Sequence, residues 1–405
     1  MHILLIHQAF VSPEEAGGTR HYELASHCVK QGHKFTIVAS DLSYLSGKRA
    51  VKERKLISKQ NLRGIKVLRS FTYPSLHRSF IWRVFSFISF MLTSIWAAMK
   101  ADRPDLVMGT SPPIFQAVSA GLVAKIKRCP FLLEIRDLWP EFAIDMGVLT
   151  NPVLIKLSRW LEKFLYARAT HILVNSPAYR DYLIKKGIES DKIAFISNGV
   201  DTNIFNGNAN GDSVRHEIGL NEKFVVTYAG ALGLANDIQT ILRAAERLQE
   251  NDRICFLLVG DGKERRNLES TARKMNLKNV IFSGSRSKAD MPGILAASDV
   301  CTATLQNIPM FTTTYPNKVF DYMAAGKPTI LAIDGVIRNV IESSNGGVFV
   351  QPGNDEAFAK AVQELEKDRA KANEMGKAAR QYVVKHFDRK QQAKQFIELV
   401  ENLTR

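Results

Sequence analysis

Short apolar segments alternate with helical patterns along the whole chain, and this alternation limits the possible folds more than any other feature of the sequence. The segments have the length of strands and are apolar on both faces, as strands inside parallel sheets are. The sequence therefore predicts an α/β protein with doubly wound, Rossmann-like sheets. The predicted strands lie at residues 3–6, 35–39, 105–109, 131–135, 171–174, 192–196, 224–228, 254–259, 280–282, 300–303, 329–333 and 347–350.

The chain is long enough for two or three domains, since it has 405 residues and 45% of them are hydrophobic. Residues 206–213 are rich in glycine and asparagine and have the composition of a linker. We therefore predict one domain at residues 1–205, a second at residues 206–388 and a separate C-terminal helix at residues 389–405.

The cysteines and the N-terminal residues indicate the cellular compartment of the protein. Four cysteines are scattered without the paired spacing of a metal or redox site, so we expect them to be small buried hydrophobic residues. Residues 1–7 have no basic start and too short an apolar run for a signal peptide. We expect a cytoplasmic protein. The cysteines are Cys28, Cys129, Cys255 and Cys301.

The positive charge lies mostly in the first half of the chain. Of the formal net charge of +15, residues 1–200 carry +13 (28 Lys and Arg against 15 Asp and Glu), and residues 201–405 carry +2 (27 against 25). Such a basic half favours an anionic partner, either nucleic acid or an acidic membrane surface. An evenly spread, solubilising surface is the alternative.

Two segments of this half stand out. Residues 41–64 are polar and basic and are expected to form an excursion over the surface. Residues 84–99 contain no charge and are bounded by Arg83 and Lys100. As a helix they would span about 24 Å, which is shorter than the roughly 30 Å hydrocarbon core of a bilayer, so we expect no crossing. A helix in the membrane interface and a core helix that covers a sheet both remain open.

Two glycine-rich loops follow predicted strands. Gly17 and Gly18 stand at the start of a helix predicted to begin at residue 17, with Arg20 able to add charge, and Gly230 and Gly233 follow the strand at 224–228. Bare backbone at a helix start allows N–H groups to approach a phosphate. The three spaced glycines of a dinucleotide site are missing, which argues against a nicotinamide or flavin enzyme. Simple tight turns are the alternative.

Charged residues also follow the strand at 131–135, where Arg136 and Asp137 come directly after it. Binding and catalytic groups of open α/β sheets gather at the carboxyl ends of strands, which favours a functional role for this pair. A buried pair that fixes the loop is the alternative.

The stretch 315–328 combines a turn at Pro316, a helix over residues 317–325 and a stop at Gly326. Lys318 and Asp321 are three residues apart and share the first turn of that helix. A cation and a carboxylate beside a helix N-terminus suit a ligand that carries both phosphate and a diol. The alternative is a surface ion pair.

This stretch resembles the donor-site motif of glycosyltransferase family 4, the retaining GT-B enzymes, in its run Met323-Ala324-Ala325-Gly326-Lys327-Pro328. The two glutamates of the family motif fall on Thr313 and Asp321, so one carboxylate is kept. Residues 198–202, Asn-Gly-Val-Asp-Thr, resemble the interdomain hallmark of the family. Leu-Trp-Pro-Glu at residues 138–141 and the Pro-x-Lys pattern at 316–318 resemble the fucosamine-transferase branch of O-antigen and capsule synthesis.

The resemblance covers nearly the whole chain and implies a GT-B fold, in which two Rossmann-like domains face each other across a cleft and the C-terminal helix crosses back to the first domain. It implies retaining transfer of a sugar from a nucleotide diphosphate donor, with UDP expected on family frequency and an N-acetylated amino or deoxy sugar as the candidate sugar. The implied acceptor is a glycan linked to polyprenyl diphosphate, in O-antigen, capsule or exopolysaccharide synthesis. No metal or other cofactor is expected, and the place of action is the inner face of the cytoplasmic membrane.

The resemblance also assigns roles to residues. Arg136, which stands where the family often has histidine, would steady phosphate charge, Asp137 would orient the acceptor hydroxyl, and Lys318 would replace a basic pair missing from the loop after residue 228. These three are the expected catalytic residues. The expected donor-binding residues are Gly17, Gly18, Gly230, Gly233, Arg286, Thr313, Thr314, Asn317, Lys318 and Asp321.

Two other functions remain open. A nucleotide-sugar epimerase shares the GT-B architecture but has no need of a membrane-facing basic half. A nucleic-acid-binding protein would use the basic half, but the chain contains no recognisable nucleic-acid-binding motif, so no nucleic-acid partner is expected.

Overall fold

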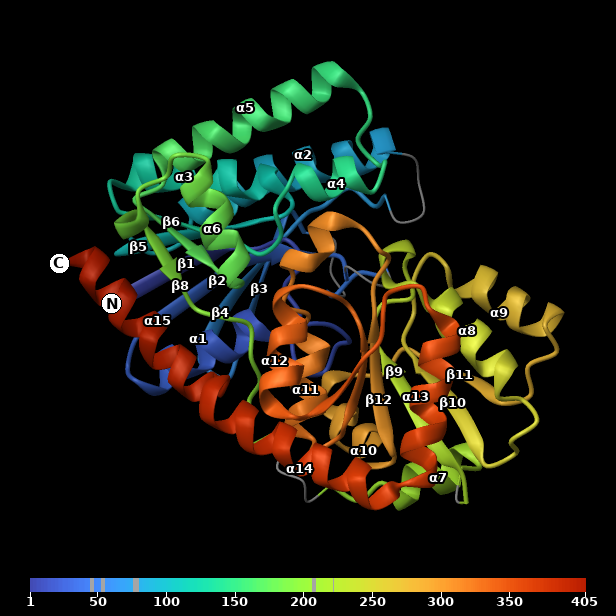
Figure 1. Ribbon diagram of the computed structural model, residues 1–405. Coiled ribbons are helices and arrows are strands. Elements are labelled where there is room, and N and C mark those ends of the chain that lie inside the picture. Colours follow the sequence, from blue (N-terminus) through green and yellow to red (C-terminus); the bar gives the residue numbers. More distant parts are fainter. Residues whose placement is uncertain (44–46, 52–54, 76–79, 206–208, 221) are drawn as a thin grey trace. The chain divides into compact units, whose positions relative to one another are not determined.

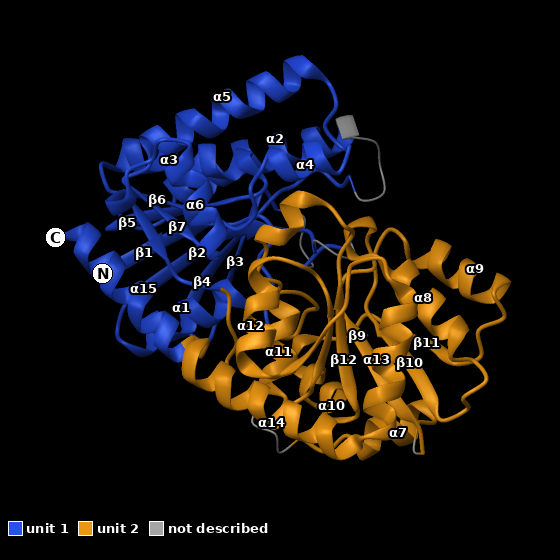
Figure 2. Ribbon diagram, viewed as in Figure 1, with its two compact units in different colours: residues 1–12, 19–197, 390–405 blue, residues 13–18, 198–389 orange. Residues whose placement is uncertain are grey.

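The computed structural model describes residues 1–43, 47–51, 55–75, 80–205, 209–220 and 222–405. The chain forms two compact units, which are coloured separately in Figure 2. Unit 1 comprises residues 1–12, 19–197 and 390–405, and unit 2 comprises residues 13–18 and 198–389. Both are α/β units, as the alternation in the sequence predicts (Figure 1).

Unit 1 contains an eight-stranded sheet in the order β3-β4-β2-β1-β5-β6-β7-β8. All neighbouring strands are parallel except β3 and β4, and the central strands are buried throughout. The strands are β1 (His2–Ile6), β2 (Lys34–Ser40), β3 (Ile57–Leu62), β4 (Ile65–Ser70), β5 (Leu106–Ser111), β6 (Phe131–Ile135), β7 (His171–Val174) and β8 (Ile193–Phe195).

Helices cover both faces of this sheet (Figure 1). On one face α1 and α15 pack against the strands, so that Ala393, Phe396 and Val400 of α15 belong to the core of unit 1. On the other face α2 and α3 contact the strands and each other, and α5 packs beside α3. The helices are α1 (Arg20–Lys30), α2 (Phe80–Met99), α3 (Ile114–Lys127), α4 (Glu141–Asp145), α5 (Pro152–Arg168), α6 (Pro177–Lys185), the 3-10 turn η1 (Ser190–Lys192) and α15 (Arg389–Thr404).

Three expectations for unit 1 need correction. Residues 41–64 are not only a surface excursion, because β3 pairs with β4 through a turn at Arg63 and Gly64, whose φ angles are 53° and 92°. Residues 44–46 and 52–54 of this segment lie outside the described residues. The first helix begins at Arg20 rather than at residue 17, so Gly17 and Gly18 precede it.

The third correction concerns α2, which begins four residues earlier than the uncharged run and has 20 residues. At about 1.5 Å per residue it is roughly 30 Å long, so its length alone no longer argues against a membrane crossing. By length and composition its segment Trp82–Met99 could span a bilayer, although 28% of that segment is buried within the chain. Phe90, Ala97 and Ala98 are fully buried, which identifies α2 as a helix that covers the sheet with one face.

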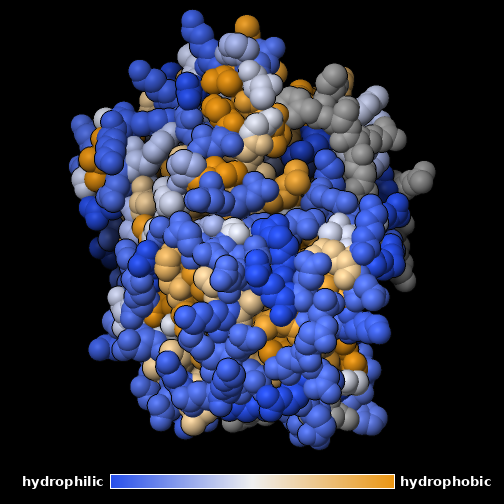
Figure 3. Space-filling model, turned by 45° about the vertical axis from the view of Figure 1, so that its right-hand side comes forward, coloured by the Kyte–Doolittle hydropathy of each residue, from blue (hydrophilic) through white to orange (hydrophobic). Residues whose placement is uncertain are grey.

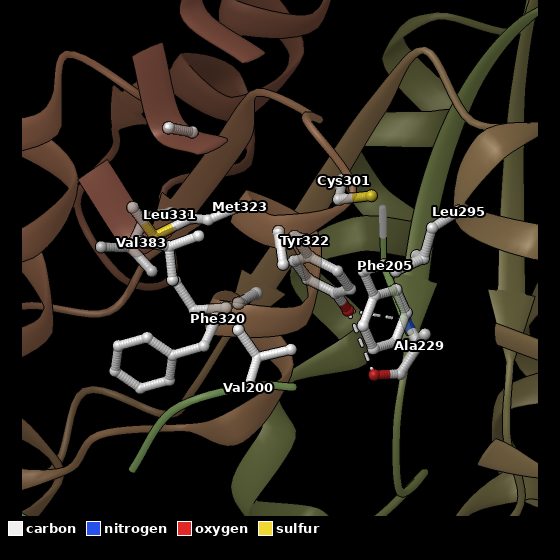
Figure 4. Close-up of a cluster of buried hydrophobic side chains, with 14 of the residues drawn as sticks. Val200, Phe205, Ala229, Leu295, Cys301, Phe320, Tyr322, Met323, Leu331 and Val383 are labelled. Carbon is white, nitrogen blue, oxygen red and sulfur yellow. Dashed lines mark hydrogen bonds between the residues drawn. The ribbon is translucent and has the colours of Figure 1, made fainter. Parts of the chain in front are cut away.

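Unit 2 contains a six-stranded sheet, entirely parallel, in the order β11-β10-β9-β12-β13-β14. Its apolar residues form one core on each face, and Figure 4 shows the core that includes Phe320, Tyr322 and Met323. The strands are β9 (Phe224–Ala229), β10 (Ile254–Val259), β11 (Val280–Gly284), β12 (Val300–Thr304), β13 (Thr329–Ala332) and β14 (Gly347–Phe349).

The helices of unit 2 alternate with these strands and close the unit with two long C-terminal helices. They are α7 (Asp212–Ile218), α8 (Ile238–Arg247), α9 (Arg265–Lys274), α10 (Met291–Ala296), α11 (Asn317–Ala324), α12 (Val336–Ser344), α13 (Asp355–Lys367) and α14 (Arg369–His386), with the 3-10 turns η2 (Leu234–Asn236), η3 (Lys288–Asp290) and η4 (Pro309–Thr313).

The units divide at residues 197 and 389, whereas the predicted domains divide at 205 and 388. Residues 198–205 belong to unit 2 because Phe205 lies in its core and Val200 exchanges backbone hydrogen bonds with Phe387 and Arg389 (3.1 and 2.9 Å). Of the predicted linker, residues 206–208 lie outside the described residues, and α7 begins at Asp212.

Candidate functional site

Helix α11 is fixed against the carboxyl end of β9 in unit 2. The hydroxyl of Tyr322 donates to the carbonyl oxygen of Ala229 (3.1 Å) and accepts from its N–H (2.9 Å), and both bonds are drawn in Figure 4. Val319 and Phe320 are fully buried, as the sequence pattern predicts, and Gly326 ends the helix with a φ of 69°. The start of α11, whose first N–H groups have no partner within the helix, is therefore held at the edge where ligands of α/β sheets bind.

Lys318 in the first turn of α11 is a partly buried cation. Its Nζ donates to the hydroxyl of Tyr228 (2.7 Å) and to Oδ1 of Asn236 (3.2 Å), and it lies 4.1 Å from the centre of the Tyr228 ring. In the part of the chain that the structure describes, no carboxylate lies within ion-pair distance of it. Burial lowers the pKa of Lys318 to about 7. An anionic ligand would supply the charge that this ammonium group lacks.

The two glycines predicted after β9 differ in what they do. A Cβ atom at Gly230 would lie 2.8 Å from Nζ of Lys318, so a side chain at this position would displace the lysine ammonium group. Gly260, directly after β10, is more tightly constrained, because a Cβ there would lie 1.8 Å from the backbone carbonyl oxygen of Gly230. Gly233 has an extended backbone, and its nearest neighbour would be 3.8 Å away. Close approach therefore requires glycine at 230 but not at 233.

Asn317 begins α11 and carries an unpaired acceptor. Its Oδ1 is buried and has no hydrogen-bond partner among the described residues. Gly18 lies beside the same side chain, since a Cβ there would be 3.6 Å from its Nδ2. The segment that contains Gly17 and Gly18 belongs to unit 2, where the carbonyl oxygen of Glu15 accepts from the N–H of Lys288 (3.2 Å). The glycine loop and the start of α11 thus lie together around an unsatisfied amide.

Asp321 forms an ion pair with Lys288, a residue that the sequence analysis did not select. Lys288 Nζ lies 2.5 Å from Asp321 Oδ2, with 11% and 17% of the two side chains exposed, and 5.0 Å from the ring centre of Phe205. Lys318 and Asp321 share a turn as expected, but each has its own partners. Lys288, Tyr228 and Asn236 are brought in by the fold, and no spacing in the sequence links them to α11.

The remaining predicted donor residues surround this site less closely. Arg286 donates to Glu217 of α7 (3.0 Å) at an exposed position. The hydroxyls of Thr313 and Thr314 donate to the carbonyl oxygens of Met310 (2.6 Å) and Phe311 (2.9 Å) and stabilise the 3-10 turn before α11. Thr313 therefore offers its oxygen, but no carboxylate, at the first acidic position of the family motif.

In unit 1, Arg136 and Asp137 have separate partners. Arg136 donates to Nε2 of His7 (3.3 Å), which assigns the ring proton of neutral His7 to Nδ1, 2.8 Å from the hydroxyl oxygen of Thr110. Many protein atoms surround the Asp137 carboxyl and raise its pKa to about 6, although the residue is open to solvent. Arg136 and a hydrogen bond from Tyr179 oppose this shift.

Beneath this pair lies a buried ionic cluster built on Glu134 of β6. Glu134 accepts from Nε of Arg20 (2.9 Å) and from Nε2 of His21 (2.5 Å), and the His21 ring lies 4.2 Å from that of His7. Burial alone would raise the pKa of Glu134, but His21 and Arg20 outweigh it and hold the pKa well below its ordinary value. Arg20 is 2% exposed and is not available to a phosphate, contrary to the expectation from its place after the glycine loop.

No group of three or more His, Cys, Asp or Glu side chains among the described residues is arranged to hold a metal ion. The four cysteines are free thiols, and burial raises the pKa of Cys28, Cys255 and Cys301. These thiols are packing residues.

Both halves of the chain match family models. A model described as "Glycosyl transferase 4-like domain" matches residues 16–199, and one described as "Glycosyl transferases group 1" matches residues 212–382. A putative colanic acid biosynthesis glycosyl transferase, WcaI of Escherichia coli K12, is 22% identical over 97% of this chain and 98% of its own length. A probable glycosyltransferase, WbjE of Pseudomonas aeruginosa, is 24% identical over 68% of this chain and 69% of its own length.

Solved structures share the fold over the whole chain. Sucrose-phosphate synthase from Thermosynechococcus elongatus has a TM-score of 0.76 at 19% identity and covers 99% of this chain and 98% of its own. Anabaena HepE in complex with UDP and glucose has a TM-score of 0.74 at 19% identity and covers 99% of both chains. These likenesses confirm the predicted two-domain α/β architecture of the GT-B type.

We predict that Glu134→Gln destabilises unit 1 by about 3–5 kcal/mol, because it leaves the buried guanidinium of Arg20 without a negative partner. Urea unfolding followed by circular dichroism measures this loss. Glu189→Gln, at an exposed position, is the control and should change the free energy of unfolding by less than about 0.5 kcal/mol. If both substitutions lowered the free energy of unfolding equally, Glu134 would not stabilise unit 1 through its ion pair with Arg20.

We also predict that Lys318→Met raises the unfolding temperature of unit 2 at pH 6 by about 2–4 °C, since it removes a partly buried cation that has no carboxylate partner among the described residues. The folded-state pKa of about 7 lies below the ordinary 10.5, so between these values the unfolded chain binds more protons. The cost of Lys318 is therefore full below pH 7 and shrinks as pH rises. Calorimetric scans at pH 6 and 9 check this, with the exposed Lys360→Met as control; a gain independent of pH would refute it.

Proposed function

Because both halves of the chain match glycosyltransferase models, the chain belongs to glycosyltransferase family 4, and we propose that it transfers a sugar from a UDP-sugar to a lipid-linked glycan with retention at the anomeric carbon. The observation that carries the donor site is Lys318, a partly buried ammonium group without a carboxylate partner at the start of α11. A nucleotide diphosphate has the charge and the shape for this position.

The groups around α11 suit the parts of such a donor. Lys318 and the first N–H groups of α11 would bind the diphosphate, and Gly230 leaves the lysine room to do so. The carboxylate of Asp321 would accept from the ribose hydroxyls, and the unpaired Oδ1 of Asn317 would accept from a sugar or ribose hydroxyl. HepE was crystallised with UDP, with UDP and glucose, and with UDP-glucose, which supports UDP as the nucleotide here.

Lys288 would position the Asp321 carboxylate for binding the ribose hydroxyls. Aspartate is one methylene shorter than the glutamate usual in the family, so the position of its carboxylate depends more on neighbouring residues. The ion pair with Lys288 holds the carboxylate at the side of α11, where it would face the ribose hydroxyls. We therefore assign Lys288 as a positioning residue for Asp321.

The transfer itself would proceed on one face of the sugar. The acceptor oxygen bonds to the anomeric carbon, the bond from that carbon to the diphosphate oxygen breaks, and the acceptor proton passes to a phosphate oxygen of the leaving group. Lys318 stabilises the negative charge that develops on that leaving group. Asp137, ionised above its pKa of about 6, would orient the acceptor hydroxyl, and Arg136 would steady phosphate charge.

The acceptor is proposed from the relatives. WcaI is named for colanic acid biosynthesis, and a structural neighbour, WaaG, is described as involved in lipopolysaccharide biosynthesis, which supports a surface polysaccharide as the product. Such glycans are built on lipid carriers, so we propose polyprenyl diphosphate as the carrier and the cytoplasmic face of the membrane as the place of action. An N-acetylated amino or deoxy sugar is the donor sugar that we would test first.

The reaction is tested by incubating the chain with UDP-sugars and a polyprenyl-diphosphate glycan. NMR of the product should show a new bond with the anomeric configuration of the donor. Release of a free epimer without an acceptor would identify an epimerase instead, and an inverted product would refute retention.

Nucleotide binding gives a sharper test of the site. We predict that UDP binds in preference to GDP, ADP and NAD, and that Asp321→Ala weakens UDP binding by roughly ten- to a hundred-fold, because a charged hydrogen-bond partner is worth about 1.5–3 kcal/mol. Isothermal titration calorimetry measures both.

The matched control is Asp252→Ala, which removes an exposed carboxylate from unit 2 and should leave UDP binding unchanged. Lys288→Met should weaken UDP binding less than Asp321→Ala, since it releases the carboxylate without removing it. If no nucleotide binds, or if Asp321→Ala is silent, α11 is only a packing helix.

A further inference from the structure

Helix α2 presents an apolar stripe to solvent from Trp82 to Met99. Phe85, Leu92 and Trp96 are 55%, 60% and 53% exposed, and with Trp82, Ile88 and Met99 they recur every three or four residues. The opposite face, with Phe90 and Ala97, is buried against the unit. The exposed stripe is therefore a second apolar face that the core of unit 1 does not use.

Helix α5 repeats this arrangement. Val153, Leu157, Trp160 and Phe164 follow one another at spacings of four, three and four residues and are 73%, 56%, 60% and 40% exposed. The side chains of Trp160 and Phe164 stack at 5.7 Å. Between the two helices lies α3, which adds the exposed Leu122 and Ile126.

The charges on these three helices have one sign at the surface. Together α2, α3 and α5 contain seven lysines and arginines and a single acid, Glu162, which is buried and paired with Lys186 (2.6 Å). Lys156, Lys163 and Arg168 of α5 are exposed beside the apolar stripe. In Figure 3 orange hydrophobic residues gather near the top of the view among blue ones, at the height of α2 and α5 in Figure 1.

We propose that the exposed face of α2, α3 and α5 docks unit 1 onto an anionic lipid bilayer, with the helices lying in the interface. Aromatic and aliphatic side chains would enter the headgroup region while lysines and arginines meet lipid phosphates. Three of the four tryptophans of the chain, Trp82, Trp96 and Trp160, lie on this face, and tryptophan favours this region of a membrane. The proposal rests on the proposed function in that a lipid-linked acceptor requires an enzyme at the membrane.

Charge favours a bilayer over a second copy of the chain. A two-fold contact would place the same positive face against itself, and the described part of α2, α3 and α5 offers no exposed acid to pair with those cations. An anionic lipid surface complements both the apolar stripe and its charge.

Vesicle flotation of the full chain tests the proposal. We expect binding to vesicles of phosphatidylcholine with roughly one third phosphatidylglycerol, weak binding to phosphatidylcholine alone, and a blue shift of tryptophan fluorescence on binding. Leu157→Gln with Trp160→Gln should reduce binding to the anionic vesicles about tenfold or more, as should Lys156→Gln with Lys163→Gln. Val384→Gln, an exposed apolar residue of α14, is the control and should bind as the unaltered chain does.

Each other outcome overturns the proposal. Equal binding to neutral and anionic vesicles would remove the role of the cations, and unchanged binding by the α5 variants would place the contact elsewhere. A dimer in sedimentation experiments that Leu157→Gln with Trp160→Gln dissociates would identify a second copy as the occupant. UDP binding by the same variants separates the two proposals, because loss of vesicle binding with UDP binding intact refutes only the docking surface.

Discussion

The two hydrogen bonds between Tyr322 and Ala229 fix the helix on which the proposed donor site of this glycosyltransferase depends. They tie the middle of α11 to the last residue of β9, so the first turn of the helix, with Asn317 and Lys318, is held at the carboxyl edge of the sheet. Tyr322 is fully buried, and a buried hydroxyl must be satisfied. The position of α11 is therefore fixed by an interaction that costs free energy to break, not by the ligand.

Because α11 is fixed, Lys318 is held at a partly buried position that is unfavourable for a charged ammonium group in the absence of an anion. Among the described residues, Lys318 lies beside a phenol and an amide rather than a carboxylate, and Gly230 leaves room for its ammonium group. Such a group destabilises the unliganded unit and would gain a partner if an anion bound, as proposed. Stability and the proposed function would then be opposed at one residue, as they are in many binding sites.

Unit 1 also contains buried charged groups, but these are paired with one another. Its buried charges are paired internally, since Glu134 receives both Arg20 and His21, and neutral His7 accepts from Arg136 above them. Arg136 is therefore oriented by a chain of buried contacts, while Asp137 beside it stays open to solvent. The same unit leaves apolar residues of α2 and α5 exposed, and the proposed membrane docking rests on these faces.

The sequence by itself determined the two-unit α/β architecture, most strands, and the start and end of α11, because buried parallel strands and a helix closed by glycine have strong local patterns. It missed β3, whose residues are half-exposed and polar, and the buried strand β4 that pairs with it, and it began α1 three residues too early. Only the tertiary structure decided that Asp321 pairs with Lys288, that Lys318 meets Tyr228 and Asn236, and that Arg20 is buried. These contacts join residues that are 33 to 114 positions apart, and no local spacing encodes which distant side chains the packing of strands and helices brings together.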